Sequence, residues 1–178
     1  VEVPTSEPPP ATPTPEPADR SHLFKTTSLN AEIVGAMNAS SDPASTEPSS
    51  TVWPTLIYDD APAAIEFLLA VGFTKSIVVP NEHDETVVEH SQLRWPEGGG
   101  VMLGTANREA NEFSQRPTGC GAVYVVTADP DAAFDRALAA GATAFRTMED
   151  QDYGGRGGTV ADAEGNLWSF GTYRPELP

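Results

Sequence analysis

The sequence predicts an α+β fold in which two βαβββ modules form a curved mixed sheet around a central cavity, with the helices outside. The main observation is an internal repeat. The segment DDAPAAIEFLLAVGFT at 59–74 recurs 69 residues later as ADPDAAFDRALAAGAT at 128–143. The second observation is that one strand-like run precedes each copy and three follow it. A duplicated unit of this kind can place its two sheets edge to edge and leave an inner face for a ligand.

The first strand and the helix of each module have clear signals. The runs VWPTLIY (52–58) and GAVYVVT (121–127) alternate as strands do, and Asp60 and Asp129 follow them as helix N-caps. We expect helices near 60–71 and 130–140, because a Pro falls in each first turn and Gly72 and Gly141 follow the last turns. Their apolar faces are Ile65, Leu68 and Leu69 in the first helix and Phe134, Ala137 and Leu138 in the second.

Three further strands complete each module. They are TKSIVVP, ETVVEHSQLRW and VMLGT in the first copy, and TAFRTM, GGTVAD and NLWSFGTY in the second. The last two strands of each copy are joined by glycine turns, PEGGG at 96–100 and DAEGN at 162–166, because glycine supplies the positive φ that a tight turn needs. The chain thus divides into module one (52–104), a linker (105–119) and module two (120–174), followed by a C-terminal end at 175–178.

Residues 1–51 are predicted to be an acidic tail rich in Pro, Ser and Thr. Seven of the first seventeen residues are Pro, and 38–51 is again polar, so these stretches cannot bury enough apolar surface to fold. Residues 21–36 contain more apolar side chains and could form one short ordered element. The chain begins with Val rather than Met, and Met37 is a candidate start.

The charge of the chain argues against nucleic-acid binding. The net charge is −16, and residues 52–178 contain 19 acidic and 8 basic residues, so the domain itself carries −11 and would repel phosphate backbones. No apolar run is long enough to span a membrane, and the N-terminal stretch lacks the basic and apolar regions expected of a secretory signal. A single cysteine, Cys120, fits a reducing cytoplasm and is expected to be buried.

Particular motifs then identify a family resemblance. The stretches WPTLIYDDAPAAIEFL, HSQLRWPEGGGVMLGTA and DYGGRGGTVADAEGNLWSFGTY, within paired βαβββ modules over residues 52–174, resemble the vicinal oxygen chelate superfamily. This superfamily includes glyoxalases, bleomycin-resistance proteins and extradiol dioxygenases. The resemblance implies either a divalent metal held by His, Gln or Glu from the first and last strands of each module, or a metal-free groove at a dimer interface. It also implies a homodimer.

The residues at the implied metal-ligand positions are unsuitable for a metal. These positions lie seven residues before each helix-starting Asp and four residues after the turn glycine, which gives Trp53, Ala122, Met102 and Ser169. None of these side chains is a normal ligand of a divalent ion. We therefore expect no metal and no other cofactor. His90 is a further candidate, but strand alternation places it with Gln92 and Arg94 and opposite Glu89, so His90 and Glu89 should not chelate together.

The same alternation predicts the wall of a ligand pocket. Aromatic side chains would stack on planar or cationic compounds, although these residues could instead fill the cavity with one another. Arg156 either pairs with a carboxylate such as Asp162 or points inward to hold an anionic group. The predicted ligand-binding residues are Trp53, Thr55, Ile57, His90, Met102, Ala122, Tyr124, Arg156 and Ser169.

Two main functions remain open at this stage. The first is a metal-free protein that sequesters a small aromatic or cationic compound, and the second is a lyase, isomerase or dioxygenase whose catalytic residues are not identified. A third is an interaction module whose Pro-rich tail binds an aromatic groove. The partner expected for either main function is a small molecule, with no nucleic acid and no membrane.

Overall fold

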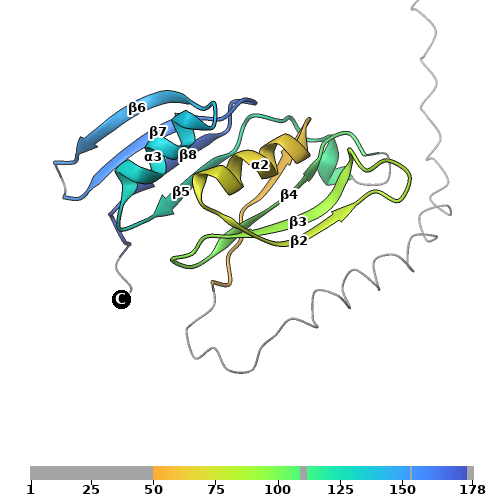
Figure 1. Ribbon diagram of the computed structural model, residues 1–178, viewed down its shortest axis with the longest axis horizontal. Coiled ribbons are helices and arrows are strands. Elements are labelled where there is room, and N and C mark those ends of the chain that lie inside the picture. The colour runs from red at the N-terminus through yellow and green to blue at the C-terminus, as the bar shows by residue number, and fades with distance from the viewer. Residues whose placement is uncertain (1–49, 109–111, 153, 176–178) are drawn as a thin grey trace, which may run out of the picture. The chain divides into compact units, whose positions relative to one another are not determined.

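The predicted pair of βαβββ modules is confirmed (Figure 1). The computed structural model describes residues 50–108, 112–152 and 154–175. The expectations for the tail, the segment 21–36 and Met37 therefore lie outside the described residues. Module one contains β1 (Thr55–Tyr58), α2 (Ala61–Val71), β2 (Thr74–Pro80), β3 (Val88–Arg94) and β4 (Gly100–Thr105). After the short 3-10 helix η1 (Glu112–Gln115), module two contains β5 (Ala122–Val126), α3 (Pro130–Ala139), β6 (Thr143–Asp150), β7 (Arg156–Ala161) and β8 (Leu167–Gly171).

Each module folds its strands into one mixed sheet of the same topology. The strand orders are β1-β4-β3-β2 and β5-β8-β7-β6, with β1 parallel to β4 and β5 parallel to β8. The other neighbours are antiparallel. Both sheets are open rather than closed, so they end in edge strands and do not form a barrel.

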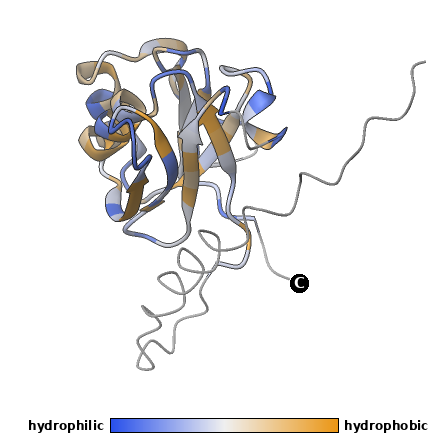
Figure 2. Cartoon of the chain, turned by 90° about the vertical axis from the view of Figure 1, so that its right-hand side faces the viewer, coloured by the Kyte–Doolittle hydropathy of each residue, from blue (hydrophilic) through white to orange (hydrophobic). Residues whose placement is uncertain are grey.

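The two helices begin and end where the sequence indicates. Asp60 Oδ1 accepts the Ala63 amide at 3.0 Å, and Asp129 Oδ1 accepts the Ala132 amide at the same distance. Gly72 and Gly141 follow the helices with φ of 128° and 99°, which only glycine adopts easily. Helix α2 is apolar except for Glu66, whereas α3 carries several charged residues; Figure 2 shows the hydropathy along the described chain. Leu138, expected on the apolar face, is instead 37% exposed.

The helices were expected outside the sheets, and the structure adds that they meet each other. Helix α2 packs on β1, β3 and β4, and α3 packs on β6, β7 and β8, so each helix covers one face of its own sheet. The two helices also contact each other, which brings the helix sides of both modules into one core. Neither helix is long and apolar enough to cross a membrane, among the residues that the structure describes.

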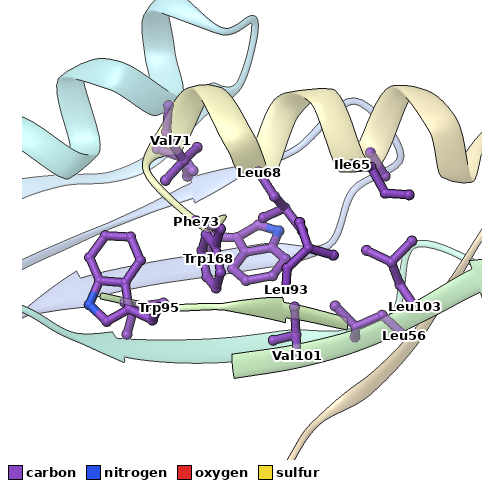
Figure 3. Packing of buried hydrophobic residues seen from close by; sticks show 14 of the residues in the cluster. Leu56, Ile65, Leu68, Val71, Phe73, Leu93, Trp95, Val101, Leu103 and Trp168 are labelled. Atoms are coloured by element: carbon purple, nitrogen blue, oxygen red, sulfur yellow. The ribbon is translucent and has the colours of Figure 1, made fainter. Parts of the chain in front are cut away.

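Aromatic side chains from both modules meet at the centre of this core (Figure 3). The ring of Phe73, which follows α2, lies 5.0 Å from that of Trp95 and 5.8 Å from that of Trp168 in β8. Trp168 is fully buried and Phe73 is 4% exposed. Burial of such large apolar surfaces is the dominant favourable contribution to folding, so the two modules stabilise each other.

The glycine turn of each module contributes a glutamate that hydrogen-bonds to the other module. Glu164, from the turn before β8, accepts the amides of Asp59 and Asp60 at 2.9 and 2.8 Å. Glu97, from the turn before β4, accepts the Ala128 amide at 3.0 Å and the Thr127 hydroxyl at 2.5 Å. Each turn thus fixes the strand-to-helix connection of the other module, and the equivalence of Glu97 and Glu164 in the repeat is seen directly.

Candidate functional site

Each sheet has one face turned away from its helix, and the predicted site residues of β1, β4, β5 and β8 lie on these two faces. We call them open face one (module one) and open face two (module two). Strand alternation decides this: Leu56 and Tyr58 join the core cluster, whereas Thr55 is exposed and Ile57 is buried outside that cluster. Trp168 and Phe170 join the cluster, and Ser169 does not. The predicted facing of Thr55 and Ser169 is seen in the structure, and the binding role of these residues stays a prediction.

On open face one, Trp53 lies just before β1 and rests on β4. A methyl group at Gly100 would collide with the Trp53 ring, so glycine allows the indole to lie against the backbone of the sheet. The Trp53 Nε1–H donates to the Ser50 carbonyl at 2.9 Å, and the Arg94 guanidinium lies 5.7 Å from its ring centroid. Thr55 pairs with Met102 in the strand register beside this ring. Together these residues form an aromatic and apolar surface.

His90 lies on the same sheet in a polar group that the sequence did not predict. In β3, two residues, Glu89 and His90, lie between the buried Val88 and Ser91, where a regular strand would have one. The extra residue is a β-bulge, which interrupts the alternation of the strand. The expected placement of Glu89 and His90 on opposite faces assumed a regular strand, so the bulge removes its basis. His90 Nε2 lies 3.2 Å from Gln92 Nε2. Burial lowers the pKa of His90, and the charge of Arg108 lowers it further.

Arg108 is the residue of this group that sequence reasoning missed. It follows β4 in the linker, and its Nε–H donates to the Thr105 carbonyl at 2.8 Å. Its Nη1 donates to the Glu89 carboxylate at 2.7 Å and also to the Glu89 carbonyl. The side chain is only 12% exposed. No sequence pattern pointed to Arg108, because its partner Glu89 lies 19 positions away in another strand.

Open face two contains a pocket of about 150 Å³. Tyr124 stands on one side of it, 46% exposed, with its ring against Gly171 and its hydroxyl donating to the Tyr173 carbonyl at 3.1 Å. The hydroxyls of Ser169 and Thr159 lie 2.8 Å apart on its floor. Ala122, two residues before Tyr124, is exposed on the same face, although it does not line the pocket.

Arg156 also lines this pocket, but its charge is directed elsewhere. The expected partner Asp162 is wrong. The guanidinium binds both oxygens of Asp131, in the first turn of α3, at 2.7 and 2.8 Å, and Asp150 at 3.2 Å. Asp162 is buried and bonded to Tyr58 and Trp168 instead. The hydrogen bonds from Arg156 lower the pKa of Asp131 below its ordinary value, and those same bonds raise the pKa of Arg156.

Asp162 is the acceptor at the centre of the junction between modules. Its Oδ2 accepts the Tyr58 hydroxyl at 2.8 Å and the Trp168 Nε1–H at 3.1 Å, and its Oδ1 accepts the Asn166 amide at 2.9 Å. Burial raises the pKa of Tyr58, and the neighbouring carboxylate raises it further.

Cys120, expected to be buried, is exposed near the same turn, because the linker joins β5 at the surface.

By module, the predicted site residues form two groups, and a pocket of about 380 Å³ is lined by residues of both modules, among them Pro54, Gly100 and Tyr124. Trp53, Thr55, Ile57, His90 and Met102 belong to open face one, and Ala122, Tyr124, Ser169 and Arg156 belong to module two. Trp, Met, Ala and Ser at the four implied ligand positions do not fit a divalent metal. In the described part of the chain, no three His, Cys, Asp or Glu side chains are arranged to hold one.

A family model described as Glyoxalase/Bleomycin resistance protein/Dioxygenase superfamily matches residues 50–170. An uncharacterized protein of Mycobacterium bovis is 37% identical over 124 residues, which are 66% of this chain and 80% of that protein. An uncharacterized protein of Mycobacterium tuberculosis is equally similar, with 71% of its length covered.

Solved structures show the same fold. TioX from Micromonospora sp. ML1 is 30% identical with a TM-score of 0.59, and the match covers 71% of this chain and all of TioX. A glyoxalase/bleomycin resistance protein from Streptomyces sp. CB03234 is 21% identical with a TM-score of 0.51, and the match covers 68% of this chain and 98% of that one. The second likeness, at this identity, concerns the fold alone.

Proposed function

The chain belongs to the Glyoxalase/Bleomycin resistance protein/Dioxygenase superfamily, and we propose that it binds and sequesters a planar aromatic or cationic compound without a metal ion. The observation that carries this proposal is the pocket on open face two. It is lined by an exposed tyrosine ring, by a pair of hydroxyls rather than a set of metal ligands, and by Arg146 and Arg156, whose charges are paired with carboxylates. Such a surface can stack on an aromatic ring and hydrogen-bond to its substituents, but it offers no group to activate water.

The charge of the domain and its exposed rings support the choice of ligand. Residues 52–178 carry a net charge of −11, which raises the local concentration of cations. Trp53 already accepts a cation, the Arg94 guanidinium, over its ring. A planar cation could replace Arg94 there or stack on Tyr124.

We further propose that the protein acts as a homodimer. Open face one and open face two belong to separate open sheets, so a second copy could supply the opposite wall of each binding groove. Phe145, in the edge strand β6, is 62% exposed, which suits a contact with another chain. Light scattering at high concentration should give twice the mass of the chain, and a clean monomer mass would contradict this proposal.

Tryptophan fluorescence can test the binding proposal. Trp95 and Trp168 are buried, so quenching by an added compound should report mainly on Trp53. Titration with polycyclic cationic compounds should give saturable quenching that Trp53→Ala largely removes and Tyr124→Ala weakens. Phe113→Ala, which changes an exposed aromatic ring on η1, is the matched control and should leave the binding curve unchanged. The absence of saturable binding to any such compound would contradict the proposal.

Salt separates the two contributions to binding. The screening length falls from about 10 Å at 0.1 M salt to about 3 Å at 1 M, so attraction by the acidic surface should weaken while stacking persists.

Elemental analysis of protein purified without added metal, followed by a soak with Ni, Zn, Mn and Fe, tests the metal-free part of the proposal. A stoichiometric metal ion at Trp53, Met102, Ala122 or Ser169 would overturn it.

His90 favours a second candidate, a lyase, isomerase or dioxygenase. Its lowered pKa keeps the imidazole neutral at pH 7, and a neutral imidazole can act as a general base. The test is mass-spectrometric analysis of a bound compound before and after incubation. Conversion that is lost in His90→Gln, with fluorescence quenching unchanged, would favour the enzyme over the sequestering protein.

A further inference from the structure

Another pocket lies on the helix side of the two sheets, opposite their open faces. It has a volume of about 270 Å³ and lies where α2, the end of α3 and the turn before β8 meet. We call it the Phe67 groove. Its wall is mostly apolar, and every charged residue in it is acidic. It is lined by Tyr58, Asp60, Ala63, Ala64, Phe67, Ala140, Gly141, Asp162, Ala163 and Glu164.

The internal repeat gives this groove a counterpart in the same chain. Shifting by the 69 residues of the repeat replaces Asp60 with Asp129 and Phe67 with Arg136. The C-terminal end of α3, at Ala140 and Gly141, is replaced by that of α2, at Val71 and Gly72. Glu164 is replaced by Glu97 when the two Glu-Gly turns are matched, which is a shift of 67 residues. We call this second place the Arg136 groove. The exchanged contacts of Glu97 and Glu164 show that the two places are equivalent in three dimensions as well.

In the Arg136 groove, the chain itself supplies a cation. The Nε–H of Arg136 donates to the Val71 carbonyl, at the C-terminal end of α2, at 2.6 Å. A methyl group at Gly72 would lie 3.2 Å from Arg136 Nη2 and 3.5 Å from Trp95 Cζ3, so the guanidinium fills the space beside this glycine. A positive group at a helix C-terminus is favourable because the last carbonyls carry partial negative charge.

In the Phe67 groove, the equivalent space is open. Phe67 replaces the arginine, and a methyl group at Gly141 would meet no atom within 4 Å. No side chain among the described residues donates to the Ala140 carbonyl, the counterpart of Val71. Asp60 and Glu164 line the groove, and the ten lining residues include no basic one. Their carboxylates accept backbone amides, so towards a ligand they supply negative charge rather than free acceptors. The groove thus keeps the helix-end carbonyl equivalent to the one that binds Arg136 in its counterpart, and it is lined by acidic residues, but it lacks the cation.

From this comparison we infer that the Phe67 groove binds a small compound with a guanidinium or ammonium group on a short apolar stem. The cationic head would donate to the Ala140 carbonyl, as Arg136 donates to the Val71 carbonyl, and it would lie near the acidic residues Asp60 and Glu164. The stem would lie along Ala63 and the Phe67 ring, which can also stack on a guanidinium. This site goes beyond the proposed function, since it shares no residue with open face one or the pocket on open face two.

NMR titration of the full chain at low salt tests this inference. The probe is n-butylguanidinium, and n-butylurea is its neutral counterpart of similar shape. The cation should shift the amide signals of Ala140, Gly141, Ala163 and Glu164 saturably, and the urea should bind at least about tenfold more weakly, because it makes no charge-assisted hydrogen bond. Equal binding of both probes, or shifts confined to Trp53 and Tyr124, would overturn the inference.

Reciprocal variants sharpen the test. Phe67→Arg supplies to this groove the side chain that fills its counterpart, so binding of n-butylguanidinium should fall at least about tenfold with an unchanged circular dichroism spectrum. Arg136→Ala should open the counterpart and add a second set of saturable shifts at Val71 and Gly72. Ala163→Lys places a cation at an exposed rim position and should weaken binding without disturbing the core. Unchanged affinity in both Phe67→Arg and Ala163→Lys would refute the site.

A peptide probe identifies the source of the cation. A capped Gly-Arg-Gly tripeptide presents the same guanidinium from a polypeptide. Binding no tighter than that of n-butylguanidinium is expected for a site that takes free small compounds. Binding at least about tenfold tighter would overturn that assignment and give the groove to an arginine of a protein partner.

Discussion

The modules meet at two junctions, one at the turn before β8 and one at the turn before β4. The backbone follows an equivalent path at both, but the side chains that meet there differ. At the first, the buried carboxylate of Asp162 accepts hydrogen bonds from Tyr58 and Trp168. At the second, the indole of Trp95, the counterpart of Asp162 in the repeat, donates to the Val126 carbonyl at 3.1 Å. Thr127 stands where Tyr58 stands and donates to Glu97 instead.

This difference shows what duplication preserves. The helix caps, the positive-φ glycines and the exchanged glutamates are kept in both modules, because they fix the path of the backbone. The buried centre of each junction was free to change, provided that every polar group found a partner. One junction therefore depends on a carboxylate network and the other on aromatic packing, and the two should respond unequally to mutation.

The largest expected effect is that of Asp162→Ala. The change leaves the Tyr58 hydroxyl and the Trp168 Nε1–H buried without an acceptor, and each such group costs about 1–3 kcal/mol. We expect the free energy of unfolding to fall by about 3–5 kcal/mol in urea denaturation. Asp162→Asn, which keeps one acceptor oxygen, should lose less. A loss below about 1 kcal/mol for the alanine variant would mean that water replaces the carboxylate.

Tyr58→Phe should have a smaller effect at the same junction. The ring stays in the core, and Asp162 keeps its bonds to Trp168 and to backbone amides, so only one hydrogen bond to a charged group is lost. We expect a decrease of about 1–2 kcal/mol in the free energy of unfolding. The double variant with Asp162→Ala should lose less than the sum of the two single changes, and strict additivity would show that the pair does not interact.

Glu97→Ala and Glu164→Ala compare the two exchanged contacts directly. Each removes the acceptor of a strand-to-helix connection at a partly exposed site, and each should cost about 1 kcal/mol. Because the two sites share no partner, the effects should add in the double variant. Thermal unfolding followed by circular dichroism measures both, and a much larger loss for one glutamate would show that the junctions are not equivalent.

The smallest expected effect is the pH dependence that His90 gives to module one. Its folded pKa lies below the unfolded value of about 6.5, so the unfolded chain binds more protons once the pH drops below that value. Stability from this group is complete above pH 6.5 and decreases as the pH falls toward the folded pKa. His90→Gln should reduce the change of the urea unfolding midpoint with pH between pH 5 and 7. An unchanged slope would show that another group titrates there.

Local signals were sufficient for the elements and their faces. Asp60, Gly72 and their repeats marked the helices within one residue of where they begin and end, and strand alternation assigned Thr55 and Ser169 to the open faces. These predictions succeeded because they depend on backbone geometry and on neighbours a few residues apart. The bulge at Glu89 was missed because it is set by pairing with β2, which the sequence does not display.

The sequence alone determined the duplicated module, its glycine turns, the acidic charge and the identity of the residues on the two open faces. All of these follow from periodicity, φ requirements and composition, which act within one strand or helix. Only the tertiary structure decided which groups meet across the junction: Asp162 with Tyr58, Arg156 with Asp131, and Arg136 with the end of α2. These contacts join residues 25 to 104 positions apart, and they depend on how two open sheets and two helices pack.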